Sequence, residues 1–302
     1  MAQRLFGIIP PMTTPFDADG EIDEAATRTQ VRWLLDRGVH GIAAGGSTGE
    51  GHTLDADELK RLVATVVEEV DGRVPVIAGI IVDSTRDAIR RGNALADLGV
   101  AALQVTPVHY LFRPDDDAML AHFRTICEAT GQKVIIYNVV PWSYLAPGLL
   151  LRIMREVPGV VGVKQSAGDL KLVADLLLGA RDGEHIFSAV DALLYPSFVL
   201  GAHGTIAALP TAAPGPCVAL WDAVQRGDHG RAHDLHRRLL RLWNALVGDN
   251  LPACVKQAQT LQGCPAGQPR APMPSASADQ RRAIEAALKA LETDAGSSVK
   301  VA

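Results

Sequence analysis

The feature that most constrains this chain is a regular alternation of short apolar segments with longer amphipathic ones. Short apolar runs rich in β-branched residues are typical of buried parallel strands. Eight of them occur in order: FGIIPP, GIAAGG, VPVIAG, AALQVT, KVIIYNV, VVGVKQ, HIFSAV and GTIAAL. A helical segment follows each, near residues 24–37, 55–71, 85–98, 115–129, 147–156, 169–180, 192–200 and 212–226. Eight such units over roughly 225 residues predict an α/β protein with a (β/α)8 barrel, or TIM barrel. The alternative is an open doubly wound sheet, which usually has five or six strands.

The residues after the eighth unit predict a helical extension. The segment GDHGRAHDLHRRLLRLWNALV has the apolar spacing of a ninth helix, and a proline-rich loop covers 265–274. A last helix is expected near 279–292, and Asp55 with Glu58 predicts a capping box at the start of the second helix. We therefore expect a barrel domain over residues 1–226 and a C-terminal helical domain over residues 227–302.

Charge and composition narrow the classes of partner. A net charge of −5 and a pI near 6.0 give no general basic surface for nucleic acid. The N-terminus does not have the pattern of a signal peptide, and no apolar run approaches the ~18 residues of a membrane span. The four cysteines have no metal-ligand spacing, which predicts reduced thiols. We expect a cytoplasmic protein that binds a small molecule, with no partner among nucleic acids or membranes and no metal.

Polar residues at the ends of the predicted strands are the candidates for chemistry, because the active site of a barrel forms where strands end and loops begin. Lys164 ends the sixth strand, which is otherwise apolar. Desolvation of an amine at the barrel mouth lowers its pKa, and the neutral amine can attack a carbonyl carbon to form a Schiff base. The alternative is a lysine that reaches solvent or pairs with a carboxylate.

Three hydroxyl groups could serve such an amine. Tyr137 ends the fifth strand, and its phenol is a candidate for proton transfer; the alternative is a core tyrosine tethered by its hydroxyl. In the glycine-rich loop GGSTGEG at 45–51, Ser47 is a candidate proton relay and Thr48 a candidate anchor for a 2-oxo acid's carboxylate. For both, the alternative is capping of the next helix. The loop has neither the lysine of a P-loop nor the glycine spacing of a dinucleotide-binding motif.

Several motifs, taken in order, resemble those of the dihydrodipicolinate synthase and N-acetylneuraminate lyase family of class I, Schiff-base-forming enzymes. They are TPF at 14–16, GGSTGEG at 45–51, VTP at 105–107, IIYNV at 135–139, GVKQSAGDL at 162–170 and GAHGTIAA at 201–208. The resemblance spans essentially the whole chain. It implies a (β/α)8 barrel with a helical C-terminal domain, usually a homotetramer arranged as a dimer of dimers, and no metal or organic cofactor.

The resemblance also assigns roles to individual residues. It makes Lys164 the Schiff-base lysine and Tyr137 the proton-transfer phenol. Ser47 matches the relay hydroxyl and Thr48 the carboxylate anchor. Ile206 is expected beside the bound 2-oxo acid.

One departure from the synthases of this family concerns the second substrate. Those enzymes resemble one another in having an arginine soon after the tyrosine. This arginine binds the carboxylate of the second substrate. The segment YNVVPWSYLAPG has no arginine between Tyr137 and Arg152. Trp142 cannot reproduce the bidentate contact of an arginine and is instead a candidate substrate-binding residue. This departure favours a catabolic member of the family.

A second departure lies in TPVHYLFRPDDD, where the synthases have two adjacent tyrosines after the proline. His109 or Tyr110 is a candidate replacement for the relay tyrosine contributed by a neighbouring subunit. The alternative for His109 is a loop histidine with no catalytic part. Asp191, after the seventh strand, is a candidate contact for a substrate hydroxyl or a helix cap.

The main hypothesis is a lyase that joins Lys164 to C2 of a 2-oxo acid or to the equivalent carbon of a cyclic imino acid. The protonated imine then assists aldol cleavage, dehydration or deamination. A deaminase of pyrroline-4-hydroxy-2-carboxylate is one candidate, and sugar-acid dehydratases and 4-hydroxy-2-oxo-acid aldolases stay open. The alternatives are a 4-hydroxy-tetrahydrodipicolinate synthase, which condenses pyruvate with aspartate semialdehyde, and a non-catalytic barrel that binds 2-oxo acids.

Overall fold

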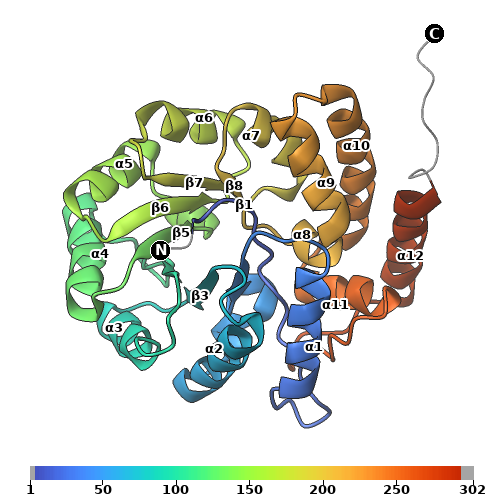
Figure 1. Cartoon of the computed structure of the whole chain (residues 1–302). Helices are drawn as coiled ribbons and strands as arrows, with labels where there is room; N and C mark the ends of the chain where they lie inside the picture. The colour runs from blue at the N-terminus through green and yellow to red at the C-terminus, as the bar shows by residue number, and fades with distance from the viewer. Residues whose placement is uncertain (1–3, 294–302) are drawn as a thin grey trace.

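Eight parallel strands form the centre of the computed structural model, which describes residues 4–293 (Figure 1). Their order is β1-β8-β7-β6-β5-β4-β3-β2. The strands are β1 (Gly7–Ile8), β2 (Ile42–Ala44), β3 (Val76–Ile80), β4 (Ala102–Val105), β5 (Val134–Asn138), β6 (Val160–Gln165), β7 (His185–Ser188) and β8 (Gly204–Thr205).

The sheet closes between β1 and β2 just beyond the short first strand. Ala43 donates its N–H to the carbonyl of Pro10 at 3.0 Å, and Met12 donates to the carbonyl of Ala43 at 2.9 Å. β1 is only two residues long because Pro10 and Pro11 lack the N–H groups that would extend a strand ladder. The predicted (β/α)8 barrel is therefore confirmed, and the open doubly wound sheet is excluded.

Helices pack around the strands in the predicted order. They are α1 (Glu24–Leu35), α2 (Ala56–Val70), α3 (Thr85–Ala94), α4 (Asp116–Thr130), α5 (Pro147–Glu156), α6 (Leu170–Gly179), α7 (Leu194–Val199), α8 (Leu209–Ala212) and α9 (Pro214–Gln225). The capping box of α2 is confirmed, since Asp55 accepts the N–H of Glu58 and the Glu58 carboxylate accepts the N–H of Asp55. The helix expected near 212–226 corresponds to α9, and the short α8 before it was not predicted; Pro214 separates the two, because its ring lacks the N–H that would continue α8.

Apolar side chains fill the inside of the barrel and the layer between strands and helices. The interior is packed by a set of buried residues from alternate strand positions: Leu5, Ile9, Ala43, Ile77, Ala102, Ile135, Phe187 and Ile206. Burial of each large apolar side chain contributes roughly 1.5–3 kcal/mol. A filled interior leaves no channel through the barrel, so a ligand can enter only at one end of the strands.

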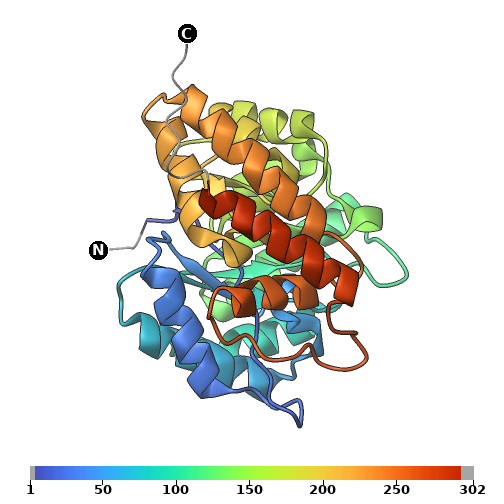
Figure 2. The same ribbon diagram turned by 90° about the vertical axis from the view of Figure 1, so that its right-hand side faces the viewer.

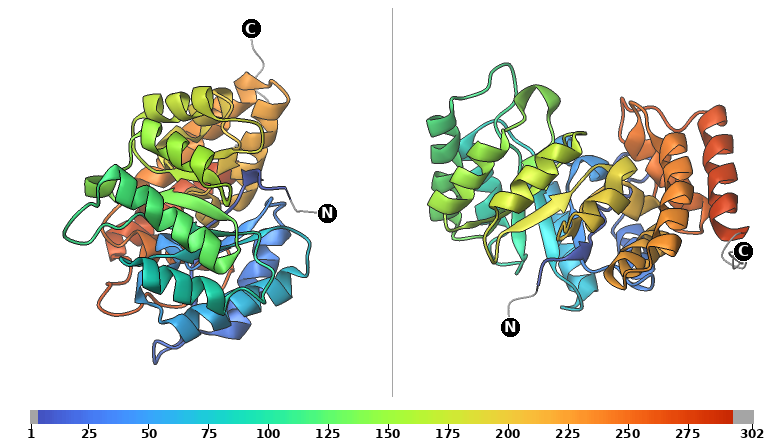
Figure 3. Two further views of the ribbon diagram at one scale, coloured as in Figure 1. Left: turned by 90° about the vertical axis from the view of Figure 1, so that its left-hand side faces the viewer. Right: turned by 90° about the horizontal axis from the view of Figure 1, so that it is seen from above.

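The C-terminal extension lies beside the barrel rather than around it (Figures 2 and 3). It consists of α10 (His229–Leu246), α11 (Leu251–Leu261) and α12 (Ala278–Thr293), with α10 packed on α9 and α12 on both α10 and α11. α10 and α12 correspond to predicted helices, whereas α11 was not predicted. Most residues of α11 are buried, and they include the polar residues Lys256 and Gln259, so polar positions in LPACVKQAQTL do not mark a solvent-exposed face.

The predicted boundary at 226/227 falls in the turn between α9 and α10. Two domains over 1–226 and 227–302 stay a prediction, and the tail of the second lies partly outside the described residues. An apolar cluster in fact includes Ile8 of β1 together with side chains of α9, α10 and α11. The extension and the barrel therefore share buried surface.

Candidate active site

The carboxyl ends of the strands open into a cavity of about 550 Å³. Its inner end is lined by five of the residues expected from the sequence: Ser47, Thr48, Tyr137, Lys164 and Ile206. Its outer wall includes residues of the C-terminal extension, namely Trp243, Asp249 and Met273. The position agrees with the rule that barrel active sites form at this end of the sheet.

Lys164 lies at the inner end of the cavity with its amine enclosed by protein. The residue is 4% exposed, on a strand whose other side chains are almost all apolar. Its Nζ lies 3.8 Å from the centre of the Tyr137 ring, since Tyr137 and Lys164 are paired in register on β5 and β6. The low exposure argues against the alternative of a lysine that reaches solvent, while the charge of Lys164 does act on the nearby carboxyl of Asp191.

Tyr137 and Ser47 come together although 90 positions separate them in sequence. The phenol of Tyr137 donates a hydrogen bond to Ser47 Oγ at 2.9 Å. Tyr137 is therefore tethered by its hydroxyl, as in the structural alternative, but the tether connects it to the predicted relay. The ring of Tyr137 thus lies against the amine, and its hydroxyl is bonded to Ser47, along which a proton can be passed.

The loop that carries Ser47 and Thr48 forms two short 3-10 turns, Ser47–Gly49 and Gly51–Thr53. A Cβ atom at Gly51 would lie 1.8 Å from the carbonyl oxygen of Gly45, so only glycine fits there. The glycines thus allow close backbone packing that aims the two hydroxyls into the cavity. Helix capping does not explain these hydroxyls, because Asp55 caps α2.

Asp191 does not cap the helix that follows it, and its contact with a substrate hydroxyl stays a prediction. Its Oδ1 accepts the N–H of Leu209, the first residue of α8, at 2.5 Å, so it caps a helix, though not the one that follows it in sequence. The same side chain lines the cavity and is 6% exposed. Burial raises the pKa of Asp191 to about 7, against the opposing effects of the Leu209 N–H and the Lys164 charge.

Glu50 lies behind the loop that carries Ser47 and Thr48, and its buried contacts were not predicted from the sequence. It occupies the turn between the two 3-10 segments with φ +55°, in the left-handed region, and its side chain is completely buried. Its Oε1 lies 2.7 Å from Nζ of Lys256 on α11. The only sequence signal was a carboxylate in a glycine-rich loop, and its partner is more than 200 residues away.

Trp142 does not line the cavity. It lies on a short 3-10 turn, Pro141–Ser143, where it is 74% exposed and donates its indole N–H to the carbonyl of His109 at 2.9 Å. His109 in turn lies against Asp83, with 3.2 Å between Nδ1 and Oδ1. His109 lies in the loop that joins β4 to α4, and Trp142 lies beside that loop. A contact of Trp142 with substrate therefore stays a prediction.

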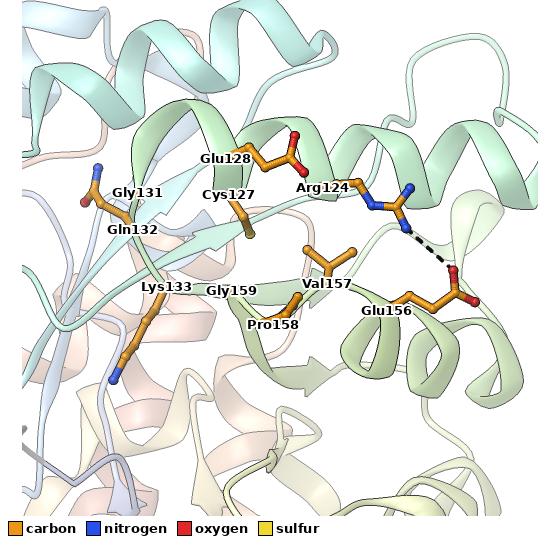
Figure 4. A pocket seen from close by; sticks show the side chains of 10 residues that line it. All are labelled: Arg124, Cys127, Glu128, Gly131, Gln132, Lys133, Glu156, Val157, Pro158 and Gly159. Atoms are coloured by element: carbon orange, nitrogen blue, oxygen red, sulfur yellow. Dashed lines mark ion pairs between the residues drawn. The ribbon is translucent and has the colours of Figure 1, made fainter.

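A second, smaller cavity of about 250 Å³ lies near the opposite ends of β5 and β6 (Figure 4). Its polar rim includes Arg124 and Glu156, which form an ion pair of 3.6 Å between half-exposed side chains. Cys127 points into it, and burial raises the pKa of this thiol to about 11, which keeps it protonated and unreactive. The candidate chemistry therefore belongs to the cavity around Lys164.

Comparison with known proteins agrees with this geometry. The profile of the dihydrodipicolinate synthetase family matches residues 4–291. The chain belongs to this family. Membership confirms the expected chemical class, that of lyases that form a lysine Schiff base.

Relatives of this family cover nearly all of the chain. A 4-hydroxy-tetrahydrodipicolinate synthase of Methanopyrus kandleri is 36% identical over 96% of this chain and 98% of its own length. The corresponding enzyme of Bacillus subtilis is 31% identical over 93% of this chain and 97% of its own. A putative dihydrodipicolinate synthetase of Pseudomonas aeruginosa has a similar structure, with a TM-score of 0.90 and 33% identity over 95% of this chain and 100% of its own.

Residues 4–293 offer neither a metal site nor a membrane-spanning helix. No cluster of three or more His, Cys, Asp or Glu side chains there has an arrangement that could hold a metal ion. No helix in the same range is long and apolar enough to span a membrane.

Proposed function

We propose that Lys164 is the Schiff-base lysine of this lyase and that Tyr137 and Ser47 form its proton relay. The observation that carries the proposal is the buried Lys164 amine 3.8 Å from the Tyr137 ring, with the phenol bonded to Ser47 at 2.9 Å. Thr48 and the amides of its loop are proposed to hold the carboxylate of a 2-oxo acid. Ile206, fully buried, packs beside it.

The reaction begins when the neutral Lys164 amine attacks C2 of the substrate. Tyr137 supplies the proton with which the carbinolamine loses water, and Ser47 passes protons between the phenol and the cavity. The resulting iminium carries a positive charge on nitrogen and accepts the electron pair of a bond at C3. Loss of a proton or of a carbon substituent from C3 gives an enamine. Carbon–carbon cleavage is the step of an aldolase, whereas an enamine formed by loss of the C3 proton can expel water or an amine from C4, as in a dehydratase or deaminase.

The outer wall of the cavity favours a substrate whose far end is not a carboxylate. Among the described residues that line the cavity no arginine is present, and the acids there are Asp249 and Asp191, the second of which burial keeps mostly protonated below pH 7. A second carboxylate would meet these acids without a cation to pair with. We therefore propose a catabolic lyase for a 2-oxo acid or a cyclic imino acid, with pyrroline-4-hydroxy-2-carboxylate deamination as the leading candidate.

A second candidate is 4-hydroxy-tetrahydrodipicolinate synthase itself. It is favoured by the names of relatives up to 36% identical over nearly the full chain. The missing arginine opposes it. A rapid condensation of pyruvate with aspartate semialdehyde would decide for the synthase and against the catabolic proposal.

Borohydride reduction in the presence of pyruvate tests the lysine assignment. We expect a reduced adduct on the peptide that contains Lys164, identified by mass spectrometry. Its absence would favour the remaining alternative, a non-catalytic barrel that binds 2-oxo acids. A panel of 2-oxo acids and cyclic imino acids, with products read by mass spectrometry, then identifies the leaving group.

We also propose that the protein is a cytoplasmic homotetramer, a dimer of dimers. An exposed aromatic patch supports association: Tyr110, Leu111, Phe112 and Trp142 are 66–86% exposed. The loop with the first three projects from the body of the molecule (Figure 2). Light scattering should show a smaller assembly when Leu111 and Phe112 are both changed to Ser, and an unchanged mass would remove this patch from the interface.

A further inference from the structure

The side of the relay loop that faces away from the cavity is fixed to the C-terminal extension by buried charges. Glu50 follows Ser47 by three residues and is absent from the cavity wall. Its Oε1 forms an ion pair of 2.7 Å with Lys256, and its Oε2 accepts the backbone N–H of Arg270 at 2.8 Å. The ion pair is essentially without solvent contact, since the Lys256 and Glu50 side chains are 2% and 0% exposed.

The partners of Glu50 are themselves held firmly. Lys256 donates a second bond to the carbonyl of Gln268 at 2.7 Å, and its Nζ lies 4.6 Å from the centre of the Phe16 ring. The Arg270 guanidinium donates to the carbonyl of Thr53 at 2.9 Å and to the carboxylate of Glu58. Both ends of the segment 50–53 are therefore bonded to residues of the C-terminal extension.

A buried ion pair is an inefficient way to gain stability. Removing two charges from water costs several kcal/mol, and well-packed apolar residues in their place are often neutral or stabilising. What such a pair provides is a defined position for the backbone that carries it. Here that backbone is a left-handed turn at a non-glycine residue, directly after the two hydroxyls that face the cavity.

We propose that Glu50 and Lys256 are positioning residues of the proton relay. The ion pair holds the loop in the position at which Ser47 Oγ accepts the hydrogen bond of the Tyr137 phenol at 2.9 Å. The C-terminal extension thereby acts on the chemistry from behind the loop, without touching substrate through Lys256. This inference rests on the relay role proposed above for Tyr137 and Ser47.

Exchange of the methyl protons of pyruvate with deuterium from solvent provides a readout that needs no second substrate. Exchange requires the imine to lose and regain a proton at C3, so its rate reports proton transfer. Borohydride trapping at equilibrium reports how much imine is present. Because a relay alters rates rather than equilibria, we expect Lys256→Met to lower the kcat for exchange about tenfold or more, with a smaller change in KM and in trapped imine.

A double-mutant cycle separates positioning of Ser47 from a general structural role. Ser47→Ala should slow exchange, and adding Lys256→Met in that background should cause little further loss, because the residue it positions is already missing. Lys171→Met, which removes an exposed ion pair with Asp175 on α6, is the matched control and should leave exchange unchanged. If Lys256→Met does not fold, the double variant Glu50→Gln/Lys256→Met takes its place, since it leaves no unpaired buried charge.

The outcomes distinguish this inference from the proposed function. A wild-type protein that neither traps pyruvate nor exchanges its protons contradicts the proposed function and removes the basis of the inference. If the wild type does both but Ser47→Ala exchanges at the same rate, there is no Ser47 relay to position. Equal losses from Lys256→Met with and without Ser47 show that Lys256 acts elsewhere, and the inference is then wrong.

Discussion

Replacement of Asp191 by Asn should change how the stability of the protein depends on pH. Burial raises the pKa of this carboxyl from 3.8 to about 7, so the folded protein keeps a proton that the unfolded chain releases. The contribution of Asp191 to stability is therefore fully present below about pH 4 and is lost as pH rises through about 7. A pKa difference of this size corresponds to about 4 kcal/mol, because one pKa unit corresponds to about 1.4 kcal/mol.

Asn is the appropriate substitution because it has nearly the shape of the neutral acid and does not titrate. Its side-chain carbonyl can still accept the N–H of Leu209, which keeps the cap of α8. Urea unfolding of both proteins between pH 4.5 and 8 measures the free energy of unfolding at each pH. We expect the wild type to lose stability relative to Asp191→Asn by several kcal/mol over this range, most steeply between about pH 4.5 and 6, with little further loss above about pH 7.

Comparison of two proteins removes the contributions of all other titrating groups. Asp175→Asn is the matched control, because this carboxylate lies in an exposed ion pair with Lys171. Its stability curve should run parallel to that of the wild type. If the Asp191→Asn curve is also parallel, Asp191 is ionised in the folded protein at pH 5, and the argument from burial is wrong.

Three other changes test separate parts of the structure. Lys164→Met should abolish borohydride trapping with pyruvate, and a retained adduct would show that another lysine reacts. The thermal midpoint of unfolding should not fall, since the change replaces a buried amine by an apolar group. Gly51→Ala should destabilise the protein by about 1–3 kcal/mol or more in urea unfolding, whereas Gly215→Ala, where no atom lies within 4 Å of the new Cβ, should change stability by less than about 1 kcal/mol. Burial lowers the pKa of His122 to about 4, so its contribution to stability is present above pH 6.5 and lost as pH falls through about 4. Because glutamine does not titrate, His122→Gln should lose about 3 kcal/mol less unfolding free energy than the wild type as the pH falls. If the free energy of unfolding depends on pH in the same way in both proteins between pH 7 and 4, the buried imidazole is not neutral as argued.

The parts of the site that the sequence could predict are those that depend on short-range patterns. Lys164 and Tyr137 were identifiable because each is a polar residue at the end of an apolar segment, and parallel strands of a barrel all end at the same rim. Their pairing in register follows from the order of β5 and β6. Ser47 and Thr48 were identifiable because their loop follows β2 directly.

The parts that the sequence could not predict depend on contacts between distant segments. The helix α11 lies between the barrel and α12 and buries Lys256 and Gln259 together with its apolar residues, so its polar positions do not mark an exposed face. Glu50 gave no sign of its role, since Lys256 and Arg270 become its partners only after the extension folds back onto the loop. The exposure of Trp142 likewise depends on a turn whose position relative to the cavity no local pattern encodes.

The contrast between residues placed by local patterns and residues placed by distant contacts explains why the chemical step is better defined than the substrate. Lys164, Tyr137 and Ser47 lie on strands or on the loop after one, so the fold brings them together wherever the eight-unit pattern occurs. The far end of the cavity is built partly from Trp243, Asp249 and Met273, which reach it through the C-terminal extension. Substitutions in the extension can therefore change which leaving group the cavity accepts while imine formation continues. If Glu50 and Lys256 act as proposed, the extension also affects how fast protons move at the inner end, so changes in specificity and in rate are physically coupled.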